Sequence, residues 1–397
     1  MAWRVAKVEE HRKEFIKQLL IGDKTVTDLC KEYQISRRTG HKWINRHKEQ
    51  GEEGLKDRSR APNSQPGKTD DRLVQKILEV KYKYPAWGPK KVLALLEAHH
   101  PEEDWPSDTT VGNILQRNGL VNPRKYRKRI PAKTEPLSHC KAPNIVWSID
   151  FKGWFLTKDR MKCDPLTITD AYSRFILYCS KLHSGRELDV WKALEGLFYK
   201  QGLPKYLRHD NGPPFATTGA GRLSGLSVKL IKAGVTPEWI EPGKPYQNGR
   251  HERMHRTLEE EAAFPMQLTL EEQQMKFNDF IYYFNFERPH EALGQKFPGS
   301  VYVPSDRSWD GKFRSPEYDS GYLVKRVRCR GQVSWNGVDI YIGKTLRNEF
   351  VGVKETDNGD GAVYFGQVFL GVIDYTGNFI TPTERSRPKC SYKTRCY

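Results

Sequence analysis

The spacing of apolar residues changes near residue 144, and this change constrains the fold more than any other feature of the sequence. Before residue 144, apolar residues recur at helical spacing; after it, β-branched and aromatic residues gather in short runs typical of strands. The expected elements are strands within 144–157, 164–182, 205–209 and 236–240, and helices over 185–201, 248–263 and 270–284. Helices and strands that alternate in this way predict an α/β domain, which we place at 141–316.

Residues 1–60 predict a helix-turn-helix domain. An amphipathic stretch at 8–20 is followed by a second helical face, a short turn at Gln34-Ile35, and Ser36, which can cap the next helix. A helix in this place reads base edges from its first turns. The residues available there are Arg37, Arg38, Thr39, His41 and Lys42. A three-helix bundle with a solvated basic face is the alternative.

Residues 68–121 predict a second helix-turn-helix domain, after a Ser-, Pro- and Gly-rich linker at 59–68. Its helices are expected over 70–84, 90–98 and 107–118, with Ser107 as the cap of the last one. The candidates that would face DNA are Thr109, Asn113 and Arg117. They are less basic than the first set.

The stretch that follows, 122–140, is expected to be a basic linker. Residues 122–134 hold six basic residues and no acidic one. Such a strip can follow a phosphate backbone and release counterions, whereas a merely solvated linker is the alternative. The DNA-contacting candidates are Arg124, Lys125, Arg127, Lys128 and Arg129.

After Gly321 the pattern becomes short strands with glycine turns, including an Asn336-Gly337 hairpin signal. A small β-barrel, or a sandwich, is expected over 321–383, with Arg326 and Arg328 on a basic edge as DNA contacts, and a basic tail over 384–397. The net charge of +17 favours a polyanionic partner, most simply nucleic acid. No apolar run approaches the roughly 20 residues of a membrane helix, and we expect no membrane partner and a cytoplasmic location, at the nucleoid when DNA is bound.

Three carboxylates stand out within 141–316. Asp150 lies inside an apolar, aromatic strand, where a carboxylate is costly unless it is paired, hydrogen-bonded or bound to a metal. Asp210 ends a short strand, and Glu252 lies one turn into a helix among arginines. Each has an ordinary alternative: a structural hydrogen bond, a turn, and a surface ion pair. Together they offer the hard oxygen ligands of a two-metal phosphoryl-transfer site.

The sequence around these carboxylates resembles the integrase-core transposases of the IS481 type, IS3-like members of the retroviral integrase superfamily. The residues that carry the resemblance are RHDNGPPF, PGKPYQNGRHERMHRTLEEE and FNFERPHEALGQKFPGSVY, with WGPKKV at 87–92 and GLKDRSRAP at 54–62. The resemblance implies a multidomain chain: tandem all-α helix-turn-helix units, a central α/β RNase H-like integrase core, and the small β-barrel.

By position, the resemblance implies that Asp150, Asp210 and Glu252 form the catalytic triad. These three carboxylates would bind two Mg²⁺ ions, and Mn²⁺ could substitute. It also implies that Arg253, His255 and Arg256 help to position DNA. The helix around Glu252 opens at Gln247 and Asn248, where the backbone can approach a phosphate.

The activity implied is that of a transposase, which binds terminal inverted repeats in double-stranded DNA, cleaves the ends to 3′-OH groups and joins them to target DNA. Joining two ends implies a homo-oligomer, at least a dimer. A non-enzymatic DNA-binding protein, either a repressor or a domesticated transposase with a dead core, is the alternative, and an RNase H-like nuclease of RNA is a weaker one.

One departure from the family pattern concerns the 41 residues between Asp210 and Glu252, a longer spacing than is usual in retroviral integrases. The Gly-, Ser- and Thr-rich segment 216–227 is expected to be an inserted loop. Its role stays open at this point, between a flap over DNA and a neutral surface feature.

Overall fold

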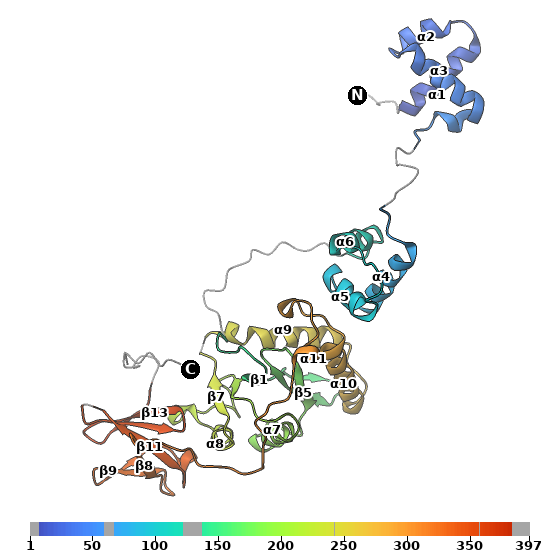
Figure 1. Cartoon of the computed structure of the whole chain (residues 1–397). Coiled ribbons are helices and arrows are strands. Elements are labelled where there is room, and N and C mark those ends of the chain that lie inside the picture. The colour runs from blue at the N-terminus through green and yellow to red at the C-terminus, as the bar shows by residue number, and fades with distance from the viewer. Residues whose placement is uncertain (1–7, 59–66, 122–136, 242, 357, 383–397) are drawn as a thin grey trace. The chain divides into compact units, whose positions relative to one another are not determined.

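The computed structural model describes residues 8–58, 67–121, 137–241, 243–356 and 358–382. The chain divides after Asp70 into two compact units (Figure 1). The expected linker contacts Arg124, Lys125, Arg127, Lys128 and Arg129, and the expected tail at 384–397, lie outside the described residues. Among the helices within those ranges, none is both long and apolar enough to cross a membrane.

The first unit is a bundle of three helices. They are α1 Val8–Ile21, α2 Val26–Glu32 and α3 Arg37–Gln50, followed by a 3₁₀ turn, Gly51–Leu55. Ser36 caps α3 as predicted, because its Oγ accepts a hydrogen bond from the Thr39 N–H at 3.1 Å. A glycine inside a helix lowers its stability. At Gly40, however, the Cβ atom of any other residue would lie 2.5 Å from Cys30 Sγ, which is too close for a van der Waals contact. The glycine therefore allows α2 and α3 to approach closely.

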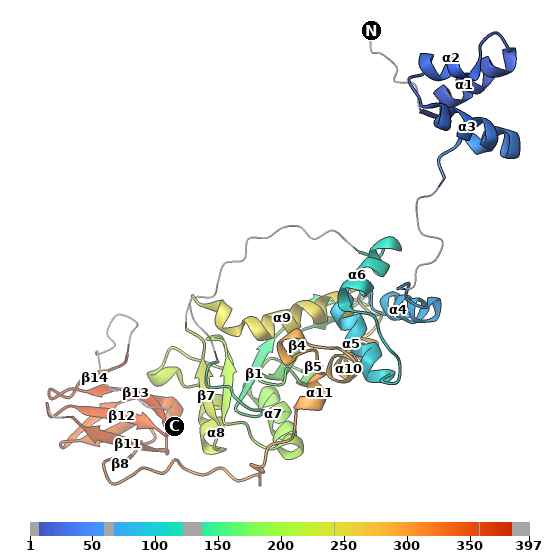
Figure 2. The ribbon, with the colours of Figure 1, turned by 45° about the horizontal axis from the view of Figure 1, so that its top comes forward.

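The second unit begins with another set of three helices, α4 Asp71–Lys83, α5 Pro89–His99 and α6 Asp108–Arg117. Their apolar faces meet around Ile77, Val92 and Val111, all fully buried. This bundle packs against a later helix, α10 Leu270–Phe286. The Trp87 indole N–H donates to the Tyr283 hydroxyl at 2.9 Å, and the Tyr84 ring stacks on Tyr283 with centroids 5.2 Å apart. Figure 2 shows the backbones of α5 and α10 side by side.

A mixed five-stranded sheet forms the centre of the second unit, in the order β5-β4-β1-β6-β7. Strand β1 pairs antiparallel with β4 and parallel with β6, and β6 pairs parallel with β7. A short separate hairpin, β2–β3, lies between β1 and β4 in the sequence. The bounds are β1 Val146–Phe151, β2 Phe155–Leu156, β3 Lys162–Cys163, β4 Pro165–Asp170, β5 Ile176–Lys181, β6 Tyr206–His209 and β7 Thr236–Trp239.

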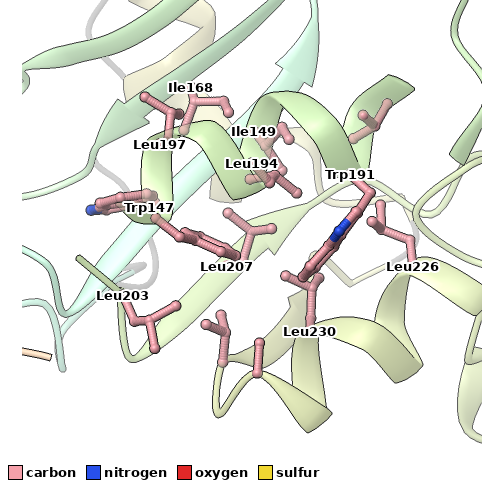
Figure 3. Packing of buried hydrophobic residues seen from close by; sticks show 14 of the residues in the cluster. Trp147, Ile149, Ile168, Trp191, Leu194, Leu197, Leu203, Leu207, Leu226 and Leu230 are labelled. Atoms are coloured by element: carbon pink, nitrogen blue, oxygen red, sulfur yellow. The ribbon is translucent and has the colours of Figure 1, made fainter. Parts of the chain in front are cut away.

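Helices cover both faces of this sheet. On one face, α7 Glu187–Gln201 and α8 Gly225–Lys232 pack against alternate strand residues such as Trp147 and Ile149 (Figure 3). On the other, α9 Gly249–Leu258 and α10 pack over β4 and β5. A π-helical turn, Glu259–Ala263, continues α9, and the remaining short helices are 3₁₀ turns at Ala220–Arg222, Pro245–Asn248 and Glu291–Leu293 and α11 Pro298–Val301.

The segment 216–227 is only partly the loop that the composition predicted: residues 216–224 form a loop with one 3₁₀ turn, whereas residues 225–227 begin α8. Ala216 bridges to Leu223, and Ser224 caps α8, its Oγ accepting the Ser227 N–H at 3.1 Å. The same segment packs on the C-terminal strands. Leu223 belongs to their apolar core, and a Cβ atom on Gly221 (φ +59°) would lie 2.7 Å from Leu370 Cδ2. The segment therefore joins the central domain to the C-terminal one, and is neither a flap nor a neutral surface feature.

The C-terminal strands form two antiparallel sheets and do not close into the predicted barrel. The larger sheet has the order β14-β13-β12-β11-β8, and the hairpin β9–β10 pairs only with itself among the described strands. The hairpin turns at Asn336 and Gly337, both with positive φ, as its sequence predicted. The bounds are β8 Leu323–Arg326, β9 Gln332–Trp335, β10 Val338–Tyr341, β11 Phe350–Glu355, β12 Gly361–Phe365, β13 Val368–Ile373 and β14 Phe379–Ile380, with a 3₁₀ turn at Lys344–Leu346.

Replacing Leu223 by alanine tests this packing. Leu223 is 1% exposed, so Leu223→Ala removes buried methyl groups and should cost about 2–5 kcal/mol, seen as a lower midpoint of thermal unfolding. Leu323→Ala, at a residue that is 50% exposed on β8, is the matched control and should change the midpoint little. Equal shifts in the two variants would contradict the packing described.

Candidate active site

Two of the three predicted carboxylates lie at adjoining ends of parallel strands. Ser148 of β1 is the register partner of Arg208 of β6. Continuing that register by two residues places Asp150 opposite Asp210, and neighbouring strands are about 4.8 Å apart. Side chains alternate between the faces of a strand, so Asp150 points away from the face on which Trp147 and Ile149 are buried. Both carboxylates thus belong to the sheet face that α9 covers.

The turn that carries Asp210 is held by several hydrogen bonds. The Gly212 N–H donates to Asp210 Oδ1 at 3.2 Å, and the buried ring of His209 pairs through Nδ1 with the Asp210 carbonyl at 2.8 Å. The Asn211 side chain donates to the Ile240 carbonyl at 2.9 Å and accepts from Arg222 Nη1 at 3.1 Å. Arg222 belongs to the segment that contacts the C-terminal sheet, and no pattern in the sequence pointed to this role.

Asp150 lies in an environment that opposes its charge. The pKa of this carboxyl is raised to about 7, mainly by burial and, in smaller part, by the negative charges of Asp210 and Glu252. The Asn248 amide, itself buried, donates to Asp150 Oδ2 at 3.5 Å. A carboxyl with this pKa lacks a compensating cation, and a divalent ion beside it would supply one.

The carboxylate oxygens at these two strand ends meet part of what a magnesium site needs. Asp150 and Asp210 offer the hard oxygen ligands that Mg²⁺ prefers, and their mutual repulsion fits a site built for a cation. Glu252 is exposed in the first turn of α9. Across the described part of the chain, no three Asp, Glu, His or Cys side chains lie close enough together to hold one ion. The pair therefore fits a metal, with Glu252 nearby but beyond shared ligand distance.

The inner face of α9 carries two histidines that pack on β4. The His251 ring is buried and lies with Nε2 2.7 Å from Thr167 Oγ1 and Nδ1 2.9 Å from Thr169 Oγ1. His255 Nε2 lies 2.6 Å from the same Thr167 hydroxyl. The ring of His255 is therefore half-buried against the sheet, and its expected role in positioning DNA stays a prediction. Residues four apart share a helix face, and this spacing assigns both histidines to the sheet.

The outer face of α9 is exposed at Arg253 and Arg256, where the sequence predicted DNA contacts. The two residues that open the helix are used locally. The Gln247 side chain accepts from the Glu241 N–H at 2.8 Å and donates to Glu241 Oε1 at 2.9 Å. Asn248 contacts Asp150 as described, so it lies next to the carboxylates rather than on the surface.

The predicted helix-turn-helix contacts lie mostly on open surfaces. On α3, Arg37, Arg38, His41 and Lys42 are exposed, while Thr39 is half-buried beside its cap. A separate set is exposed on α6: Thr109, Asn113 and Arg117. On the C-terminal strands Arg326 and Arg328 are exposed, and Arg328 pairs with Asp339.

Comparison with known protein families places each part of the chain. Models described as "Integrase core domain" match residues 141–245 and 233–298. Models of a helix-turn-helix domain and a homeodomain-like domain match 11–63 and 39–115. The model "IS481 family transposase, C-terminal domain" matches 322–381. The chain carries the domain set of the IS481-type integrase-core transposases. The predicted fold class, an α/β integrase core between helix-turn-helix domains and a β-rich C-terminal domain, is confirmed.

The chain is also similar to individual proteins and solved structures. The chain is 23% identical to the transposase for insertion sequence IS1202 of Streptococcus pneumoniae, over 95% of this chain and 90% of that one. It is 27% identical to an uncharacterized 31.7 kDa protein of insertion element IS407 of Burkholderia multivorans, over 59% of this chain and 82% of that protein. A solved structure of the HTLV-2 integrase catalytic core domain in complex with magnesium aligns with 41% of this chain and 97% of its own, at 15% identity and a TM-score of 0.30.

The raised pKa of Asp150 gives a stability test for this transposase. The pKa of the folded carboxyl, about 7, lies above that of an unfolded chain. Ionisation therefore destabilises the fold progressively from pH 4 upward and fully above pH 7. In EDTA at pH 8, Asp150→Asn should raise the midpoint of thermal unfolding by several degrees, and at pH 4 this difference should vanish.

Adding Mg²⁺ at pH 8 should reverse the order, since the ion stabilises the wild type more than the variant. Asp279→Asn, exposed on α10, is the control and should behave as the wild type throughout. Equal midpoints for wild type and Asp150→Asn in EDTA at pH 8 would refute the electrostatic description of Asp150.

Proposed function

We propose that the chain is an active DNA transposase that cleaves the ends of its element by Mg²⁺-dependent phosphoryl transfer and joins the resulting 3′-OH groups to target DNA. The observation that carries this proposal is the pair Asp150 and Asp210 on adjoining parallel strands, with the pKa of Asp150 raised to about 7. Structural carboxylates are usually neutralised by a nearby cation or by several donors, whereas Asp150 has a backbone hydrogen bond at Phe151 and a long contact with Asn248, which do not offset its burial.

Each residue of the site has a part in this chemistry. Asp150 and Asp210 would hold Mg²⁺, or Mn²⁺ in its place, and Glu252, whose exposed side chain on α9 lies apart from them, would have to turn toward the ion to complete the ligand set. When bound, two such ions stabilise the attacking and leaving oxygens of an in-line displacement. The hydrogen-bonded Asp210 turn keeps that carboxylate in place between turnovers. The exposed Arg253 and Arg256 would position the DNA strand beside Glu252.

The helix-turn-helix units would supply the sequence recognition. Their exposed side chains lie on α3 and α6, which correspond to the helices that enter the major groove in such units. We expect them to bind the terminal inverted repeats, and we expect at least a dimer because two ends must be joined. Arg326 and Arg328 on the C-terminal strands would add contacts to the phosphate backbone.

Cleavage of a labelled element end tests the proposal. The substrate is a duplex carrying the inverted repeat from the DNA that flanks the gene. The wild type with Mg²⁺ or Mn²⁺ should nick this duplex, and Asp210→Asn should abolish nicking while changing the dissociation constant less than about twofold, because ligand loss disables the metal site without touching the recognition helices.

Asp306→Asn, exposed beyond α11, is the matched control and should retain cleavage. Failure of the wild type to nick its own end sequence would favour the alternative, a non-enzymatic DNA-binding protein such as a repressor or a domesticated transposase. Preference for an RNA–DNA hybrid over duplex DNA in competition would favour a nuclease of RNA.

Arg38 offers a test of end recognition. Arg38→Ala should weaken binding to the element end by about 1–3 kcal/mol and relax specificity, because a bidentate contact to a guanine is worth that much. Binding to random duplex should change far less, and Lys48→Ala, exposed in the last turn of α3, serves as the control. An equal loss on both duplexes would assign Arg38 to a phosphate contact instead.

A further inference from the structure

Two arginines from distant parts of the chain converge on one carbonyl oxygen beside α9. The Arg250 Nη1 group donates to the Ala171 carbonyl at 3.0 Å, and the Arg174 Nη1 group donates to the same oxygen. Arg174 follows β4 in a turn and has a positive φ, whereas Arg250 lies in the first turn of α9. Since both guanidinium groups reach a single acceptor, their charges lie within a few ångström of each other.

These two charges have no acidic partner. Neither Arg174 nor Arg250 forms an ion pair anywhere in the described ranges. Asp170 is the acid adjacent to them in the chain, but its oxygens accept from the Asn144 N–H, the Ser173 N–H and the Ser173 hydroxyl. The charge of Asp170 acts on Arg174 more weakly than the repulsion from Arg250 does, and one neutral carbonyl cannot balance two guanidinium groups, so the positive charge of the pair is only partly balanced.

Further positive charge surrounds the pair. Arg253 is exposed one turn along α9 from Arg250. The pKa of Arg174 is lowered to about 10, mainly by burial and, in smaller part, by the charges of Arg250 and Arg253. Arg174 and Arg250 are both half-buried, and within the described chain none of their nitrogens is both buried and unpartnered. Their remaining N–H groups can therefore still bind a ligand.

We propose that Arg174 and Arg250 together bind one backbone phosphate of the DNA that enters the catalytic site. A guanidinium fork matches the geometry of phosphate oxygens, and an anion between the two groups would relieve their repulsion. The shared acceptor Ala171 follows the end of β4 that pairs with Trp147, three residues before Asp150 on β1. The site is thus about 10 Å along the strands from the catalytic carboxylates, and it rests on DNA being the ligand of the proposed function.

Salt dependence of DNA binding tests this inference on the full chain. In EDTA, where no cleavage occurs, the dissociation constant for a random-sequence duplex is measured between about 50 and 300 mM KCl. Each phosphate contact contributes about 0.9 to the slope of log K against log salt. The double variant Arg174→Gln, Arg250→Gln should therefore lose about 0.9 of the slope and bind roughly tenfold more weakly at 0.1 M salt.

Matched variants distinguish phosphate binding by the two arginines from effects on folding and on net charge. Arg174→Lys and Arg250→Lys keep both charges and should retain most of the slope. Arg314→Gln removes a charge that is exposed and paired with Asp310, and it should leave the slope unchanged. If the double variant unfolds, the single variants Arg174→Gln and Arg250→Gln are used instead, because each keeps one guanidinium group on the shared Ala171 carbonyl; each should still lower the slope.

An unchanged slope in the glutamine variants would overturn the inference, as would an equal loss in Arg314→Gln. A change in oligomeric state with the slope unchanged would assign the arginines to a contact between copies. Stabilisation of the wild type by inorganic phosphate alone, lost in the double variant while DNA binding is unaltered, would assign them to a free anion. If the slope falls as expected but the wild type never cleaves, the proposed function fails and this site stands.

Discussion

The parallel pairing of β1 with β6 is the constraint on which the site depends. It places Asp150 opposite Asp210, on the sheet face covered by α9, at a separation where two carboxylates oppose each other's ionisation. The apolar residues on the opposite face, Trp147 and Ile149 among them, are packed under α7 and hold β1 in that register. A shift of the β1 register by one residue would turn Asp150 toward the apolar core. The packing of the core and the pairing of the two carboxylates therefore require the same register.

The domains around this sheet are connected through side chains rather than merely joined in sequence. Trp87 and Tyr84 of the second helix-turn-helix unit pack on Tyr283 of α10. Leu223 enters the core of the C-terminal sheet, and its neighbour Arg222 bonds to Asn211, next to Asp210. The second helix-turn-helix unit and the C-terminal sheet therefore both pack on the central domain, which carries the candidate site.

Much of this could be predicted from the sequence. Apolar periodicity placed the helices and strands to within a few residues, and cap residues such as Ser36 and Ser107 marked where helices begin. The predictions were incomplete where composition concealed a contact. Helix α8 was hidden in a Gly- and Ser-rich segment, because the partner that buries Leu223 lies about 140 residues later in the chain. The basic neighbours of His255 in the sequence suggested a DNA contact, yet its ring packs on β4 within hydrogen-bond distance of the Thr167 hydroxyl.

The sequence alone determined the order of the domains, the identity of the three carboxylates and the basic character of the helix-turn-helix units. Each of these features depends only on residue type and on the local spacing of apolar residues. Only the tertiary structure decided that Asp150 and Asp210 lie together with Glu252 set apart, that the segment 216–227 binds the C-terminal sheet, and that Arg174 meets Arg250. These are contacts between residues far apart in the chain, and they depend on strand register and helix rotation, which local periodicity does not specify.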